Sequence, residues 1–209
     1  MGKVRVLAVR YLANASPALC EALGAPRDCP ALGLLTTDCD DATYIALDAA
    51  TKAAEVVVAY GRSFYAGAAN ASTPNVGEVI GILAARTPGA VRSGMEAALG
   101  ALERLGFEEV NKVPYLAHTV SSTGSFLSRE AGIRRGEPLA YLIAPPLEGM
   151  YALDAALKAA DVRLCKLYAP PTETNFGGGL LTGTQSACEA ACAAFAAAVA
   201  EVAVRPVEG

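Results

Sequence analysis

The sequence predicts an α/β (α+β) fold in which one small unit occurs twice in tandem. Residues 45–56 (IALDAATKAAEV) and 151–162 (YALDAALKAADV) are identical at nine of twelve positions, which indicates an internal repeat. Apolar runs with strand or helix periodicity also follow one another in the same order in each half of the chain. We expect the boundary after residue 106, with domains at 1–106 and 107–209.

The first half is expected to contain four strands and three helices. The strands cover residues 4–11, 31–37, 56–60 and 77–84, and the helices are a short one ending at 23 and longer ones over 44–55 and 87–105. Asn14 or Ser16 can cap the short helix, which Gly24 ends. Thr87 caps the last helix, with Pro88 at its first position.

The second half repeats this order from about residue 113, after a linker over 106–112. The expected elements are a strand, a short helix at 124–131, a strand at 139–144, a helix at 147–159, a strand at 162–168, a glycine loop, a strand and a helix at 184–203. Each copy is then a small mixed or antiparallel sheet with its helices on one face.

Composition excludes several classes of function. The net charge is −4, so no nucleic-acid partner is expected. No apolar run reaches the length of a bilayer span, since Glu189 and Glu201 interrupt the alanine-rich stretch 187–203, so no membrane insertion is expected. The start of the chain lacks the apolar core of a secretory signal, which favours a cytosolic location. One histidine and the absence of CxxC spacing argue against an enzyme, a metal site or a cofactor.

Acidic residues form the first candidate site. Asp38, Asp40 and Asp41 follow a strand end, where they could bind a cation, or where Asp40 or Asp41 could cap the helix at Tyr44. Glu78 lies in an otherwise apolar strand, where a carboxylate must face solvent or find a partner. Two such carboxylates near a cleft would suit a primary ammonium ligand.

Two loops rich in small residues form the second candidate site. They cover residues 66–75 and 172–179. Neither has many side chains large enough to anchor it in a core, so each could be a mobile gate or an ordinary flexible hairpin loop.

The chain resembles the bacterial microcompartment shell domain (BMC domain), in its circularly permuted tandem form, because a strand and a short helix precede the first buried strand. Within that group it is similar to the shell proteins of ethanolamine-utilisation compartments. The motifs that carry the likeness are LGLL at 32–35, DDATYIA at 40–46, YGRSFYAGAA at 60–69, GEV at 77–79, YLAH at 115–118, TGS at 123–125, AYLIAPPLE at 140–148, ETN at 173–175 and LTGTQ at 181–185. The likeness covers about residues 4 to 205.

This resemblance implies a homotrimer whose six domains form a pseudohexameric tile of a microcompartment shell in the bacterial cytoplasm, next to other shell proteins. It implies a gated central pore for metabolites or cofactors, and ethanolamine bound between the two domains of a chain; cobalamin binding is associated with some members. The implied ethanolamine contacts are Asp40, Asp41, Glu78, Phe107 and Thr182. The implied pore-loop residues are Gly67, Asn70, Asn75, Thr174, Asn175, Phe176, Gly177 and Gly178.

Two other classes of protein stay open at this point. Duplicated βαβ units with a cleft also describe a regulatory protein that senses a small molecule. An enzyme acting on an amine could use Asp40, Asp41 and Glu78 as acid–base groups, but no nucleophile, metal set or cofactor motif accompanies them.

Overall fold

The structure, a computed structural model, describes residues 3–64, 79–170 and 172–207, which form two compact units. The first unit consists of the described part of Lys3–Gly106 together with a short segment from further along the chain, Gly124–Leu127. The second unit consists of Phe107–Thr123 and the described residues from Ser128 onward.

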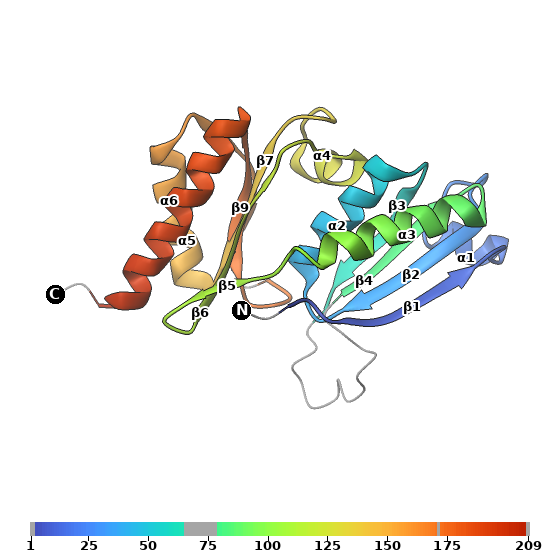
Figure 1. Cartoon of the computed structure of the whole chain (residues 1–209), viewed down its shortest axis with the longest axis horizontal. Helices are drawn as coiled ribbons and strands as arrows, with labels where there is room; N and C mark the ends of the chain where they lie inside the picture. The colour runs from blue at the N-terminus through green and yellow to red at the C-terminus, as the bar shows by residue number, and fades with distance from the viewer. Residues whose placement is uncertain (1–2, 65–78, 171, 208–209) are drawn as a thin grey trace. The chain divides into compact units, whose positions relative to one another are not determined.

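The first unit is an antiparallel sheet with the strand order β1-β2-β4-β3. Its elements are β1 (Val6–Leu12), α1 (Pro17–Ala22), β2 (Ala31–Thr37), α2 (Asp40–Ala53), β3 (Val57–Ser63), β4 (Val79–Ala85) and α3 (Pro88–Leu102). The two long helices α2 and α3 lie side by side across one face of this sheet (Figure 1).

Small residues in the central strands let the long helices of the first unit approach closely. A Cβ atom added to Gly81 on β4 would lie 2.7 Å from the Leu47 side chain of α2, and one added to Gly33 on β2 would lie 2.7 Å from Val91 of α3. The alternate residues of these strands point to the opposite face. There Leu32 and its neighbours form a separate cluster with the short helix α1, made of Ala15, Cys20, Ala25, Leu32, Ile82 and Ala84.

The second unit repeats the arrangement, with the strand order β5-β6-β7-β9-β8 and antiparallel pairing throughout. Its elements are β5 (Glu108–Val110), β6 (Val113–Val120), α4 (Ser125–Ala131), β7 (Leu139–Ala144), α5 (Pro146–Ala159), β8 (Val162–Tyr168), β9 (Gly177–Gly183) and α6 (Gln185–Val204). Helices α5 and α6 pack against each other and against the sheet (Figure 1).

Three sequence-based expectations about local structure were wrong. The linker 106–112 contains strand β5, which forms a hairpin with β6 through Asn111 and Lys112, both at positive φ (48° and 67°). Asn-Gly or Asp-Gly usually indicates such a two-residue turn in a sequence. Here the turn is Asn-Lys, so the sequence did not predict the hairpin. Helix α2 begins at Asp40 rather than at Tyr44, with Cys39 as its N-cap, so neither aspartate is the cap. Gly177 and Gly178 open strand β9 instead of lying in a loop.

Helix α6 is the one helix in the described residues that is long and apolar enough to cross a membrane by length and composition alone. Core helices of globular units pass the same test, and one face of α6 is built into a core. Its buried residues are Cys188, Ala191, Cys192, Phe195, Ala198 and Val199, which pack with Leu142, Leu153 and Leu181 of the second unit. Packing in this core accounts for the apolar residues on that face of α6.

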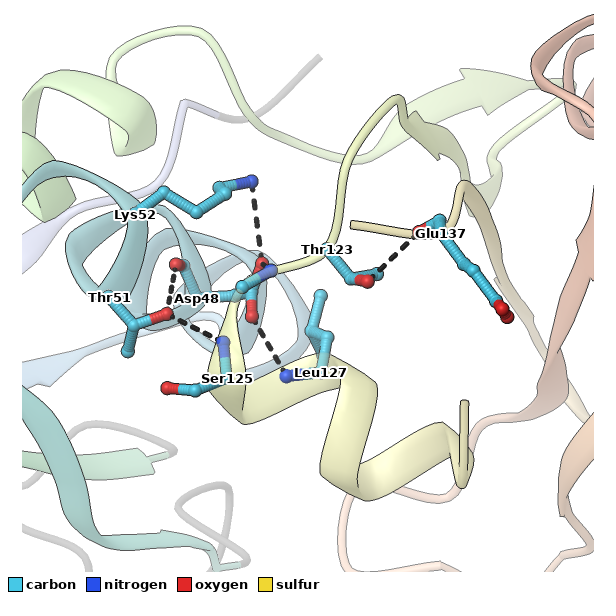
Figure 2. A network of polar contacts seen from close by, with 8 residues as sticks. Asp48, Thr51, Lys52, Thr123, Ser125, Leu127 and Glu137 are labelled. Atoms are coloured by element: carbon cyan, nitrogen blue, oxygen red, sulfur yellow. Dashed lines mark hydrogen bonds and ion pairs between the residues drawn. The ribbon is translucent and has the colours of Figure 1, made fainter. Parts of the chain in front are cut away.

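A buried carboxylate on α2 holds the segment Gly124–Leu127 in the first unit (Figure 2). The Asp48 side chain is fully buried and accepts hydrogen bonds from the backbone N–H of Gly124 at 2.7 Å and of Leu127 at 2.9 Å. One turn further, the Thr51 hydroxyl accepts from the Ser125 N–H at 3.0 Å, and the Lys52 ammonium lies 3.4 Å from Asp48. A Cβ on Gly124 would lie 2.2 Å from the Thr51 hydroxyl, so only glycine fits there.

Replacing Asp48 by alanine is expected to lower the free energy of unfolding by about 2 to 5 kcal/mol, because two buried N–H groups lose their acceptor. Urea unfolding followed by circular dichroism measures this change. Asp28→Ala is the control, since Asp28 and its partner Arg86 are exposed and that variant should unfold at the wild-type midpoint. Equal midpoints for the Asp48 variant and the wild type would contradict the role given to Asp48.

Candidate functional site

The acidic site lies at the amino end of α2, where β2 and β3 both end. Asp40 and Asp41 occupy the first turn of the helix, and each is only 7% exposed. Asp40 accepts a hydrogen bond from the Asp41 N–H at 2.9 Å and another from the Ser63 side chain at the end of β3. The positive end of the helix dipole favours carboxylates at this position. The structure therefore buries the two predicted aspartates side by side and adds Ser63 to the acidic site.

Burial is the main influence on Asp40. Desolvation raises the pKa of its carboxyl above the ordinary value for aspartate, and the hydrogen bonds from Ser63 and from the Asp41 backbone oppose that rise. A buried aspartate with a raised pKa is an unfavourable group to ionise, and a cationic ligand beside it would lower that cost. Such a group is a candidate for binding rather than for stability.

Tyr44 extends the site by one helical turn. Its phenolic oxygen lies 2.5 Å from the Ser63 hydroxyl, so Tyr44, Ser63 and Asp40 form a connected chain of polar groups. The Tyr44 ring also packs against Phe126 of the inserted segment, with ring centroids 5.9 Å apart. Sequence reasoning missed Tyr44 and Ser63; the motifs around residues 40–46 and 60–69 contain both, but nothing in their spacing shows that the two hydroxyls meet.

Asp38 is not part of this cluster. One of its carboxylate oxygens accepts from the Arg5 N–H at 2.7 Å, and the other lies 3.3 Å from the Arg5 guanidinium. Glu78 falls outside the described residues. Its chain neighbour Val79 pairs with Thr37 on one side and Ser63 on the other, at the same end of the sheet as Asp40.

Phe107 and Thr182 belong to the second unit, not to the unit of the aspartates. The Phe107 ring packs edge-on against Phe176, with centroids 5.4 Å apart. Thr182, on β9, donates its hydroxyl proton to the Pro138 carbonyl at 2.7 Å. The Thr182 oxygen is therefore left as an acceptor for a ligand.

The predicted pore-loop residues divide between described and undescribed parts of the chain. Gly67, Asn70 and Asn75 lie outside the described residues. Thr174, Asn175 and Phe176 form a turn closed by two hydrogen bonds, from the Asn175 N–H to the Thr172 carbonyl at 3.1 Å and from the Thr172 hydroxyl to the Phe176 carbonyl at 2.8 Å.

The two glycines that follow this turn have a packing role in β9. A Cβ on Gly178 would lie 1.9 Å from the Leu142 carbonyl oxygen of the neighbouring strand, so no other residue fits between these strands. Gly177 pairs with Ala144 at the end of β7. Their expected place in a loop was wrong because this close strand contact, rather than loop flexibility, requires glycine.

The chemistry available at the acidic site is binding of a cation. Two carboxylates, a serine and a tyrosine offer acceptors to an ammonium group, and the described residues contain no cluster of three or more His, Cys, Asp or Glu that could hold a metal. A duplicated antiparallel α/β unit with such a site suits a protein that binds a small cation.

Comparison with known families defines the class. The family profile for the BMC domain matches residues 31–115. This range begins at β2, runs through α3 and ends in β6, so it crosses from the first repeat into the second. The match identifies the class as bacterial microcompartment shell proteins.

Whole-chain relatives make the identification more specific. The chain is 60% identical over 205 residues to the bacterial microcompartment shell protein EutL of Clostridium perfringens, covering 96% of this chain and 94% of that protein. It is 47% identical to EutL of Salmonella typhimurium over 207 residues, covering 97% and 94% of the two proteins. The crystal structure of EutL from Leptotrichia buccalis matches with a TM-score of 0.95 at 58% identity, covering 99% of this chain and 97% of that one. The chain belongs to the EutL family of bacterial microcompartment shell proteins.

Membership of this family decides between the classes left open by the sequence. Proteins of the family are structural components of microcompartment shells in the bacterial cytoplasm and are not enzymes. The chain is accordingly a shell protein that forms oligomers within such a shell. Neither an amine-converting enzyme nor a free regulatory sensor fits this membership.

Replacing Asp40 by asparagine is expected to stabilise the protein at pH 7. The folded-state pKa of Asp40 is raised, so its contribution to stability is present at low pH and is lost as the pH rises through that value. The gain should therefore be largest near neutral pH and vanish below about pH 4, where the unfolded chain is protonated too. Thermal unfolding from pH 4 to 8 measures it. Asp38→Asn is the control and should show no gain in stability, because Asp38 pairs with Arg5. A loss of stability in Asp40→Asn at pH 7 would contradict the burial argument.

Proposed function

We propose that the chain forms a homotrimeric, pseudohexameric tile with a gated central pore, in the shell of a compartment that uses ethanolamine. In this proposal residues 1–106 and 107–209 are its two permuted BMC domains, and metabolites or a cofactor pass the pore. Ethanolamine and cobalamin are the proposed small-molecule partners. The relatives at 60% and 47% identity are named EutL, and the crystallised relative is described as an ethanolamine utilisation protein. Other shell proteins of the same compartment are the expected neighbours of the tile.

The observation that carries this proposal is the repetition of one sheet order. The strands β1-β2-β4-β3 of the first unit correspond to β6-β7-β9-β8 of the second, with the two long helices packed together in each. Three chains therefore supply six nearly equivalent units, the number that a six-sided tile needs. The loops proposed for the gate are those of Gly67, Asn70 and Asn75 and of Thr174, Asn175 and Phe176; Gly177 and Gly178 are left out because they open strand β9.

Purified protein is expected to sediment as a trimer at micromolar concentration and to form sheets or tubes at high concentration. The reason is that a tile must associate both within itself and along its edges. Sedimentation velocity measures the first association, and electron microscopy of concentrated samples shows the second. A monomer at micromolar concentration would contradict the proposal.

For the ligand, we propose that Asp40, Asp41 and Glu78 bind the ammonium group of ethanolamine, with Phe107 and Thr182 as further contacts. The support is the buried pair of carboxylates at the amino end of α2, where burial raises the pKa of Asp40 and a cationic ligand would offset the cost of its charge. Thr182 has an oxygen left to accept from the ligand hydroxyl, since its own proton is donated to Pro138. A small primary ammonium ion matches this set of acceptors in charge and size.

Asp40→Ala and Glu78→Gln are each expected to weaken ethanolamine binding about 10-fold or more while leaving the trimer intact, because each removes one charge-assisted hydrogen bond. Isothermal titration calorimetry measures the affinity, and sedimentation checks the trimer. Asp38→Ala is the matched control: it removes a nearby acid that is already paired with Arg5, and it should bind like the wild type. Unchanged affinity in both test variants would remove the ligand proposal and leave the proposal of a shell tile untouched.

A further inference from the structure

The two repeats differ in how one matching segment is used. In the first unit, Gly124–Leu127 binds to α2 through the Asp48 carboxylate, although in sequence the segment comes from the second repeat. Its counterpart in the first repeat is the start of α1. The two stretches can be aligned on the glycines that follow their short helices, because Gly24 and Gly132 have the same left-handed conformation, at φ 71° and 63°. In this alignment Ser16 matches Gly124 and Leu19 matches Leu127.

The exposure of the two segments is opposite. Leu127 is 1% exposed, whereas Leu19 is 42% exposed. The N–H groups of Gly124 and Leu127 donate to Asp48, whereas those of the matching Ser16 and Leu19 have no acceptor among the described residues. The Ser16 side chain does not cap α1 either. The start of α1 therefore presents to solvent the same two backbone donors and the same leucine that are buried in the other copy.

The surface that would receive this segment is also duplicated. Asp48 lies in the most similar part of the repeat, and its counterpart on α5 is Asp154. The Asp48 side chain is fully buried under the segment, whereas that of Asp154 is 63% exposed. Each aspartate has a lysine one turn later, with Lys52 at 3.4 Å from Asp48 and Lys158 at 2.5 Å from Asp154. The polar part of the receiving surface is thus conserved between the two helices.

The apolar surroundings of Asp154 point the same way. Tyr151, Leu164 and Leu167 on α5 and β8 are large apolar residues that are exposed in the single chain. Their counterparts in the first unit are Ile45, Val58 and Gly61; the first two are buried, and a Cβ on Gly61 would lie 3.7 Å from the Phe126 ring of the inserted segment. The α5 face therefore has the carboxylate, the lysine and an uncovered apolar surround. We name the residues Tyr151, Asp154, Leu164 and Leu167 the α5 surface.

We infer that the α5 surface of one chain binds the start of α1, Ser16–Leu19, of a second copy of the chain, with Asp154 accepting from the Ser16 and Leu19 N–H groups. The contact repeats between chains the interaction that Asp48 makes within one chain. Each chain carries one such segment and one such surface, so the contact is head-to-tail and closes only in a ring. This inference rests on the proposed trimer and names the interface that joins its chains.

Asp154→Ala and Leu19→Asp are each expected to raise the concentration at which the oligomer dissociates by about 10-fold or more. The first removes the acceptor of two N–H groups, and the second sets a charge against the apolar part of the α5 surface. Sedimentation velocity over a dilution series measures the dissociation. Circular dichroism and urea unfolding check that the subunits stay folded, which is expected because both side chains are exposed in the single chain.

Glu189→Ala and Val204→Asp serve as matched controls, since both change exposed residues of α6 that lie outside the α5 surface and α1, and they should dissociate like the wild type. A trimeric wild type whose Asp154 and Leu19 variants dissociate at the same concentration would overturn the inference and leave the proposed tile intact. A wild type that is monomeric would instead overturn the proposed function itself.

Discussion

The first unit depends on one buried carboxylate. Asp48 has no exposed surface, and its two oxygens accept from backbone N–H groups of a segment more than seventy residues away in the chain. A carboxylate is favourable there only because it is matched by those donors and by the Lys52 ammonium. Through this contact Gly124–Leu127 becomes part of the first unit and brings Phe126 to the Tyr44 ring, next to the acidic site.

The acidic site distinguishes the two copies of the duplicated fold. Asp40 and Pro146 occupy the same first position of α2 and α5, so the helix begins in the same way in both copies. Proline at that position serves the helix alone, since it lacks an N–H that would have no partner there. Aspartate serves the helix dipole but carries a buried charge with a raised pKa. The proposed ligand site therefore belongs to the copy with the aspartates and has no equivalent at Pro146.

Periodicity and turn residues predict most of the fold. The strands β2, β7 and β8 have the predicted bounds, and Thr87 caps α3 by accepting from the Ala90 N–H, as predicted. These elements are defined by local patterns. The failures have long-range causes: β5 is a strand because it pairs with β6, and Gly178 is required by the Leu142 carbonyl of another strand.

The candidate site was predictable only in part for the same reason. Asp40 and Asp41 stand out in the sequence as charges next to a buried strand, and the structure buries both in the first turn of α2. Ser63 and Tyr44 are ordinary strand and helix residues until the fold joins the two hydroxyls. The insertion of Gly124–Leu127 has no local signal at all, because its reason is the carboxylate of a distant helix.

That insertion also bears on how the gene can have evolved. Tandem duplications are often imagined as reversible, with each copy able to return to an independent gene. Here the first unit includes four residues encoded after the boundary between the copies. A gene cut at that boundary would encode a first half in which Asp48 lacks both its N–H donors and the segment that covers it. The contact therefore favours keeping the two copies in one gene.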